Sequence, residues 1–208
     1  MPAKNSVKNY IEDSYYHVYN RGVADTKIFL DDQDYKVFLH YLEKYLDSSS
    51  QHSLAKNIKL LAYCLMPNHF HLFCLQLTKD GITKLIRALS TSYVMYFNRK
   101  YDRLGTLFQG IFKAAHIDQD SYFLHISRYI HLNPQKTTPD WRNYPYSSYS
   151  VYMGKKNVSW IDPAPVLNFF TESKNNNTIL PQKHFSYKSF VEDFSTNSKD
   201  EIGELSID

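Results

Sequence analysis

Two histidines in the stretch PNHFHLF, residues 67–73, are the first candidates for chemistry. The residues around them favour a β-strand, in which alternate side chains share a face, so His69 and His71 point one way and Phe70 the other. Their Cα atoms would then lie roughly 6.5–7 Å apart, which is two strand rises. Two imidazoles at this spacing can hold one cation. The alternative interpretation is a pair of surface histidines on a solvated sheet face.

A predicted helix near residue 130 carries the groups that a two-histidine site still needs. Tyr129 and Asn133 are four residues apart, which places them on one helix face. Because Pro134 disfavours helix at the residue before it, Asn133 lies on the last turn, where its amide oxygen can join two imidazole nitrogens. Two nitrogens and one oxygen with open positions suit Mg²⁺ or Mn²⁺ at phosphate oxygens, although Zn²⁺ or Cu²⁺ could bind more tightly in vitro.

The chemistry expected of such a site is attack on a phosphate. The cation would polarise a phosphate oxygen, and Tyr129, one turn from Asn133, would be the nucleophile. A phosphotyrosine keeps much of the energy of the cleaved bond, so a DNA hydroxyl can reverse the step. Simpler interpretations also stand, since Tyr129 could be a core residue and Asn133 a C-cap. His125, one turn before Tyr129, could bind phosphate, move a proton or be a surface histidine, and His17 receives no role.

Contacts with a polyanion are indicated by charge and by aromatic content. Residues 79–142 contain ten Lys or Arg and five Asp, a net charge of +5, whereas residues 171–208 contain four Lys and seven Asp or Glu, a net charge of −3. A basic middle with an acidic tail favours a nucleic-acid partner. The 18 tyrosines could stack on unpaired bases, although most should be packing residues. Residues of this kind are individually more often solvated charges, and the candidate phosphate contacts are Lys84, Arg87, Lys113 and Arg128.

The elements that must position these residues follow the order β-α-β-β-α-β-α. Strands are expected over 14–20, 57–66, 69–77 and 111–117, and helices from near 33 to 46, over 82–100 and from about 120 to 133. The first helix should be capped by Asp31 or Asp32, and the third by Asp118 or Asp120. The first six elements match the split βαβ pattern, in which helices pack on one face of an antiparallel sheet. The sequence therefore predicts an α+β fold of the ferredoxin-like, RRM-like type.

The chain after Pro134 is expected to be looser, with one short helix from Pro163 or Pro165 to Phe170. Residues 171–208 are acidic, rich in Asn and Ser and poor in periodic apolar positions. We therefore expect a catalytic domain over residues 1–170 and a loosely ordered appendage over 171–208, whose burial should be slight.

The bulk composition describes a globular chain. It has 208 residues and 43% hydrophobic content, which allows a core, and no apolar run approaches the roughly 20 residues of a membrane span. The opening stretch, MPAKNSVKNYIEDS, lacks the apolar region of a secretory signal. Cys64 and Cys74 lie in apolar runs and are expected to be buried, reduced thiols. We therefore expect a cytoplasmic protein, acting at the nucleoid of a bacterial cell, without a membrane partner.

Four stretches resemble, in order and spacing, the single-tyrosine HUH transposases, and the branch that looks nearest is that of the REP-associated tyrosine transposases. The stretches are YHVYNRG, LMPNHFHLF, GTLFQGIFKA and SRYIHLNP, and the resemblance covers roughly residues 12–160. The specific part of this pattern is MPNHxH at positions 66–71 followed by RYIxxNP at positions 128–134.

The resemblance implies that His69 and His71 are metal ligands, that Asn133 is the third ligand of that branch, and that Tyr129 is the nucleophile. Many relatives have Gln where this chain has Asn133. The resemblance further implies a ferredoxin-like core that cleaves and rejoins single-stranded DNA beside imperfect hairpins through a 5′-phosphotyrosine, with Mg²⁺ or Mn²⁺. Relatives include monomers and homodimers that exchange the tyrosine helix, so either state is expected here.

Two other functions stay open on the sequence. A catalytically idle relative that binds DNA hairpins as a regulator would share the basic middle and the aromatic residues, but would not need all four of the residues just assigned. A small metallohydrolase would use metal-bound water and would need no tyrosine on that helix face.

Overall fold

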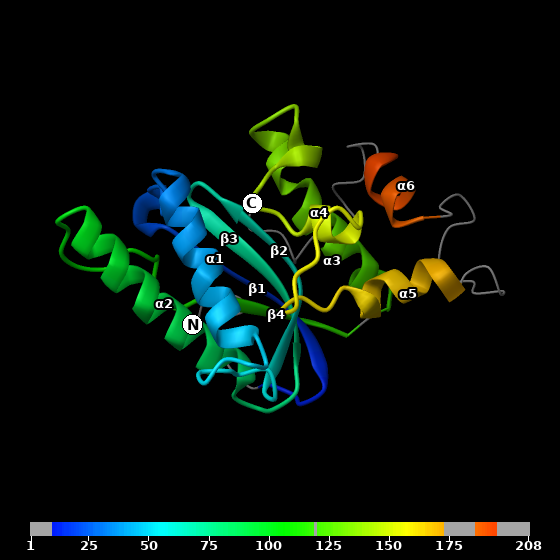
Figure 1. Cartoon of the computed structure of the whole chain (residues 1–208), viewed down its shortest axis with the longest axis horizontal. Coiled ribbons are helices and arrows are strands. Elements are labelled where there is room, and N and C mark those ends of the chain that lie inside the picture. The colour runs from blue at the N-terminus through cyan, green and yellow to red at the C-terminus, as the bar shows by residue number, and fades with distance from the viewer. Residues whose placement is uncertain (1–9, 119, 173–185, 195–208) are drawn as a thin grey trace, which may run out of the picture.

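The computed structural model describes residues 10–118, 120–172 and 186–194, and within them the seven elements follow the expected order (Figure 1). They are β1 (Ser14–Arg21), α1 (Asp32–Leu46), β2 (Ile58–Met66), β3 (His69–Gln76), α2 (Gly81–Lys100), β4 (Lys113–Ile117) and α3 (Asp120–Leu132). The strands form one antiparallel sheet in the order β2-β3-β1-β4. This is the predicted α+β arrangement, and the expected hairpin of β2 and β3 is present.

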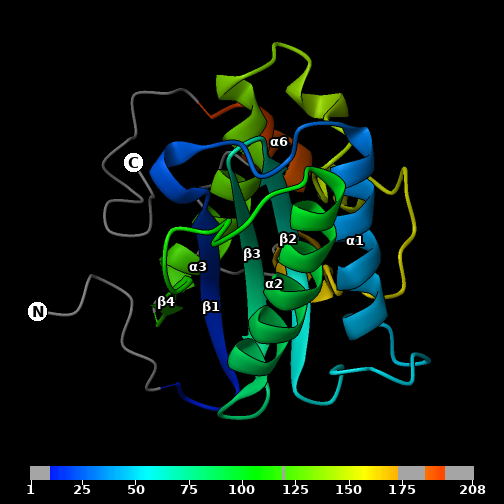
Figure 2. The same cartoon turned by 90° about the vertical axis from the view of Figure 1, so that its left-hand side faces the viewer.

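Helices cover both faces of the sheet, whereas the sequence pattern placed them on one (Figures 1 and 2). On one face α1 and α2 pack over Phe70 and Leu72, and on the other α3 packs over Phe73. The strands are apolar on both sides: β2 reads IKLLAYCLM, and a bulge after Leu60 turns both Leu61 and Ala62 toward α3. A strand that is apolar on both sides needs a cover on each face, because either face would otherwise expose apolar surface to water.

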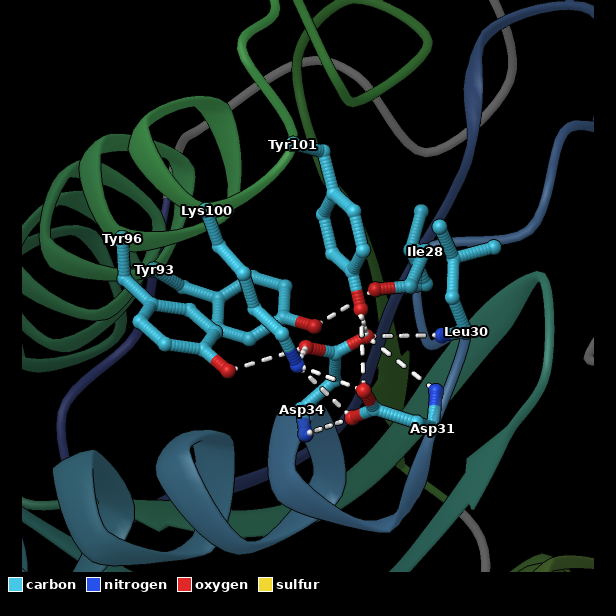
Figure 3. Close-up of polar contacts among 8 residues, drawn as sticks. All are labelled: Ile28, Leu30, Asp31, Asp34, Tyr93, Tyr96, Lys100 and Tyr101. Carbon is cyan, nitrogen blue, oxygen red and sulfur yellow. Dashed lines mark hydrogen bonds and ion pairs between the residues drawn. The ribbon is translucent and has the colours of Figure 1, made fainter.

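Carboxylates fix the start of α1 (Figure 3). Asp31, one of the two expected caps, accepts a hydrogen bond from the Asp34 N–H at 3.1 Å and completes a capping box. The Asp34 carboxylate is buried and accepts a hydrogen bond from the backbone N–H of Leu30 at 2.7 Å. It also accepts from the Lys100 ammonium (2.8 Å) and from the hydroxyl groups of Tyr101 (2.8 Å) and Tyr96 (2.9 Å). Burial alone would raise the pKa of Asp34, but the ion pair with Lys100 and these hydrogen bonds hold it below its usual range.

The same region ties both helices to the turn that precedes His69. The backbone N–H groups of Ile28 and Phe29 donate to the Pro67 carbonyl at 2.8 and 3.1 Å. The Tyr93 hydroxyl of α2 donates to the Ile28 carbonyl at 2.5 Å. The β2–β3 turn is therefore held from the helical layer, and this fixes where β3 begins.

The segments after α3 cover the edge of the sheet at β2. A 3-10 turn follows α3 at Asn133–Lys136, a second lies at Trp141–Asn143, and two short helices follow, α4 (Tyr149–Tyr152) and α5 (Ala164–Glu172). Backbone hydrogen bonds join Leu65 to Tyr146 (2.9 Å) and Ser148 to Tyr63 (3.0 Å). Pairing of this kind covers an edge strand that would otherwise be open to other chains. The expected helix ending near Phe170 is α5.

The expectation of slight burial beyond residue 170 is wrong for the part that the structure describes. Residues Tyr187–Glu192 form α6, whose Tyr187, Phe190 and Val191 are buried in the core beside α3 and α5. Ser186 caps α6 in a capping box with Ser189, a local signal at the level of sequence. The residues 173–185 and 195–208 of the expected appendage lie outside the described residues. No described helix has both the length and the apolar character that a membrane crossing requires.

We predict that Asp34→Asn lowers the free energy of unfolding by about 3 kcal/mol at pH 7, because the new amide nitrogen faces buried donors that lose their acceptor, and Lys100 keeps only its ion pair with Asp31 at 2.7 Å. Since the folded pKa of Asp34 is depressed, its stabilisation is present above about pH 4 and is lost as the pH falls through the folded value. Urea unfolding at pH 7 and at lower pH measures this, with the exposed Asp193→Asn as control. Equal stability of the two variants at pH 7 would refute the role of the Asp34 network.

A second prediction concerns α6. A chain that ends after residue 185 should lose at least about 3 kcal/mol of stability, the cost of emptying one buried phenylalanine site. A chain that ends after Phe194 keeps α6 and is the control. Thermal unfolding of both chains measures the difference, and equal transition temperatures would show that α6 adds nothing to the core.

Candidate functional site

The predicted site residues lie on the sheet face that α3 covers. Strand alternation places His17 and Tyr19 of β1 on this face together with His69 and His71 of β3. In the antiparallel register, Tyr19 lies opposite His71. The histidines therefore lie where β3 begins, below the last turns of α3.

His71 is fully buried, so the surface interpretation is wrong for this residue. Its Nδ1 lies 2.9 Å from Nε2 of His17, and its Nε2 has no hydrogen-bond partner among the described residues. Burial holds the pKa of His71 well below its usual range, and the neighbouring charges of His69, His17 and Lys136 lower it further. The Asn133 amide opposes this shift in part, although it makes no hydrogen bond of ordinary geometry with Nε2. His71 is therefore neutral at pH 7, the form that can act as a metal ligand.

His69 is half-buried, and both of its ring nitrogens have polar neighbours. Nδ1 lies 2.7 Å from Oδ1 of Asn68, and Nε2 lies 3.5 Å from Oδ1 of Asn133. The Asn133 amide nitrogen donates to the Tyr129 carbonyl at 3.2 Å, which turns Oδ1 toward His69. This hydrogen bond also caps a carbonyl at the end of α3, so the two interpretations of Asn133 are compatible.

Tyr129 lies beside the histidines. It is half-buried, and its ring meets His71 nearly edge-on, with centroids 5.3 Å apart and an interplanar angle of 84°. The His17 ring lies 5.9 Å from it at 77°. The structure thus brings Tyr129, Asn133, His69 and His71 together, as the spacing predicted. In the described ranges, this site included, no group of three or more His, Cys, Asp or Glu side chains could hold a metal ion, so a cation here would need the Asn133 amide beside the two histidines.

Of the predicted phosphate contacts on the sheet and on α2, only Lys113 lies on the face of the site. It begins β4 and pairs with Tyr19. Lys84 and Arg87 lie on α2, which covers the opposite face, and line a cavity of about 630 Å³ beside α1. Lys84 also forms an ion pair with Asp80 at 2.9 Å. The structure does not bring these two residues to the histidines.

Arg128 serves packing, which corrects its assignment as a phosphate contact, whereas the role of the half-buried His125 beside it stays a prediction. The Arg128 guanidinium is buried, 4.4 Å from the Phe190 ring centroid and 3.7 Å from that of Phe194. Its Nη2 lies 2.6 Å from Nδ1 of His125, and the His125 ring meets Phe190 edge-on. The reason is α6, which covers this side of α3 and was not expected there.

Three residues of the site were not predicted. Arg21 is exposed, lies opposite His69 in the β1–β3 register, and donates from Nε to Oε1 of Gln109 at 2.5 Å. Strand alternation would have found it, because Arg21 is four residues after His17. Lys136 lies in the turn after α3, and its charge acts on His71. Asn68 precedes His69 in the turn, and no periodicity marks it.

Comparison with known proteins gives the family. Residues 10–133, more than half of the chain, match the family model described as IS200-like transposase. No curated protein shows a significant sequence match. The structure of a REP-associated tyrosine transposase bound to a REP hairpin aligns with a TM-score of 0.55 and 15% identity, over 74% of this chain and 93% of that one. A transposase structure from Deinococcus radiodurans R1 aligns over 60% of this chain and 94% of that one, with 15% identity and a TM-score of 0.40, too low to support an argument.

The family match agrees with the site geometry and with the predicted family. The alignment to the REP-associated tyrosine transposase shows a shared fold, and this agrees with the predicted ferredoxin-like sheet. The family match spans the two histidines, Tyr129 and Asn133. The chain belongs to the family of IS200-like transposases.

Proposed function

We propose that this chain is a metal-dependent transposase of the REP-associated branch, which cleaves and rejoins single-stranded DNA next to hairpins. Tyr129 is the nucleophile, and His69, His71 and Asn133 are the metal ligands. The observation that carries the proposal is that the His69 and His71 ring centroids lie 4.9 Å apart, with the Asn133 oxygen 3.5 Å from Nε2 of His69 and one helical turn from Tyr129. Family membership supports DNA transposition as the class of reaction.

The residues fit a divalent cation. The buried Nε2 of His71 has no hydrogen-bond partner in the described ranges, and a buried polar atom in this state needs an explanation. Nε2 of His69 and Oδ1 of Asn133 face each other at 3.5 Å. Two nitrogens and an amide oxygen suit Mg²⁺ or Mn²⁺ with phosphate and water in the open positions. When bound, the cation would act as a Lewis acid at a phosphate oxygen.

The covalent step uses the Tyr129 phenol. Its oxygen forms a bond to a DNA phosphorus while the bond from that phosphorus to the preceding 3′ oxygen breaks. The phenol gives up one proton and the leaving oxygen takes one up, so the products are a 5′-phosphotyrosine and a free 3′ hydroxyl. A second 3′ hydroxyl reverses the step and joins strands without ATP, since one phosphoester replaces another. The rings of His71 and His17, which meet Tyr129 edge-on, limit where its ring can lie.

The DNA partner is single-stranded or hairpin DNA, and the chain acts as a monomer or a homodimer. The similar transposase of known structure is bound to a REP hairpin, which supports this choice. Three basic side chains surround the site from three elements, Arg21 on β1, Lys113 on β4 and Lys136 after α3. Cations in these positions would hold phosphates on either side of the cut.

We predict that Tyr129→Phe abolishes covalent attachment to DNA, lowering it at least about 10³-fold, because the phenol oxygen is the nucleophile. Fold and DNA binding should remain, since the change conserves volume. The measurement is an SDS-resistant adduct with a labelled hairpin carrying a single-stranded flank, in the presence of Mn²⁺. Chelation of the metal should have the same effect as the mutation.

The matched control is Tyr122→Phe. Tyr122 lies on the same helix, two turns before Tyr129, and should keep adduct formation. An adduct from Tyr129→Phe, or one mapped to another tyrosine, would remove Tyr129 from the mechanism. Hairpin binding without any adduct from the wild type would instead favour the regulator that binds DNA without cutting it.

A further prediction concerns Arg21. Arg21→Ala should weaken binding of the single-stranded flank about tenfold and lower the slope of log Kd against log salt by about 1, because one phosphate contact is lost. Arg99→Ala removes the same charge from an exposed position on α2 and should change neither the affinity for the flank nor the salt slope. Fluorescence anisotropy over a range of salt concentrations measures both. Equal losses in the two variants would mean that binding depends on net charge alone.

A further inference from the structure

Each candidate metal-binding histidine has a partner at Nδ1, the ring nitrogen that faces away from the ligand set. Nδ1 of His71 lies 2.9 Å from Nε2 of His17, and Nδ1 of His69 lies 2.7 Å from Oδ1 of Asn68. The proposed chemistry gives Asn68 no role and uses His17 only as a ring beside Tyr129. Both partners come from outside α3, one from the neighbouring strand and one from the turn.

The Asn68 contact fixes the proton of His69. The Asn68 amide nitrogen donates to Oδ1 of Asp25 at 2.8 Å, so the amide group presents its oxygen to His69. An amide oxygen only accepts hydrogen bonds, so Nδ1 of His69 carries the proton. In the neutral ring Nε2 then holds a lone pair, which points at the Asn133 oxygen 3.5 Å away.

The turn that carries Asp25 is shaped for this contact. Ala24 and Asp25 have positive φ values of 49° and 61°, in the left-handed region that side chains rarely adopt. A Cβ at Gly22 would lie 2.0 Å from the Thr26 carbonyl oxygen, so only glycine fits there. The Gly22 N–H donates to the Asn68 carbonyl at 2.8 Å, which joins the two turns.

The His17 contact acts on His71 in the same way. One of the two facing nitrogens must donate the proton. If His17 donated it, the proton of neutral His71 would be on Nε2, a buried atom without a hydrogen-bond partner in the described part of the chain. If Nδ1 of His71 donates to Nε2 of His17, both atoms are satisfied and Nε2 of His71 keeps a lone pair. In the second arrangement the proton of neutral His17 lies on its own buried Nδ1, and the lone pair of His71 Nε2 stays on the side of Asn133, where a cation can use it.

We propose that His17 and Asn68 are positioning residues that hold His71 and His69 in the Nδ1–H tautomer, so that both Nε2 lone pairs and the Asn133 oxygen converge on one cation. The inference rests on the proposed metal site. It explains the closeness of two electron-rich atoms, His69 Nε2 and Asn133 Oδ1, which repel each other unless a cation lies between them. Partners of this kind orient the ring of a metal-bound histidine and raise its affinity for the metal.

The first test reads the tautomers of the metal-free wild-type protein. Two-bond ¹⁵N–¹H correlation spectra of the histidine rings, assigned with His69→Ala and His71→Ala, should show the proton on Nδ1 in both residues at neutral pH. A proton on Nε2 of either ring would overturn the inference for that residue. This measurement needs neither metal nor DNA.

The second test measures the affinity for Mn²⁺ without DNA, from the electron paramagnetic resonance signal of free Mn²⁺. His17→Phe and Asn68→Ala should each weaken binding about 10- to 100-fold. His17→Gln should recover part of the loss, because its amide oxygen can accept from His71. The control is His116→Phe. His116 is exposed on β4 with its ring near Tyr16, and this variant should bind Mn²⁺ as tightly as the wild type does.

The two tests separate failure of the positioning role from failure of the metal site. Wild-type affinity in folded His17→Phe and Asn68→Ala, checked by thermal unfolding, would overturn the positioning role alone. A wild type that binds no Mn²⁺ would overturn the metal site, and with it the purpose assigned to the two residues. If His17→Phe does not fold, His17→Gln and the wild-type spectra still decide the question.

Discussion

The pairing of β1 with β3 is the constraint on which the site depends. A slip of one residue would turn the two histidines of β3 toward α1 and α2, because side chains alternate between the two faces of a strand. Two sets of contacts oppose such a slip. One is the specific ring packing of β3, with Phe70 against Phe38 on one side and Phe73 against Phe123 on the other. The other is the set of hydrogen bonds from Gly22, Ile28 and Phe29 to the turn before β3.

The helix α3 contributes side chains both to the hydrophobic core and to the candidate site. Its apolar side chains, Ile126 and Ile130 among them, fill the second face of the sheet, and the same packing sets the height of Tyr129 above the histidines. Pro134 lacks the N–H that would continue the helix, so the chain turns at Asn133. The last turn of α3 thus lies over the start of β3, and a short side chain there reaches the first histidine of that strand.

Much of this was predictable from the sequence because it depends on local periodicity. The period of two placed both histidines of β3 on one face, and the period of 3.6 placed Tyr129 and Asn133 together. The contact of His17 with His71 was not predictable in this way, since it depends on the register between two strands that are far apart in the chain. Arg128 was misassigned for a similar reason, because its burial depends on α6. That helix is too short to form alone, so the packing surface of α3 has to stabilise it.

Asparagine suits position 133 because both polar atoms of its amide make a contact there. The nitrogen donates to the Tyr129 carbonyl, four residues back, and the oxygen faces His69. An aspartate could not donate to that carbonyl and would add a negative charge beside a buried, neutral His71. A glutamine would carry the amide one methylene further from the helix end, so one rotamer could not easily satisfy both contacts. The short amide therefore connects the carbonyl of Tyr129 to the ring of His69 through a single side chain.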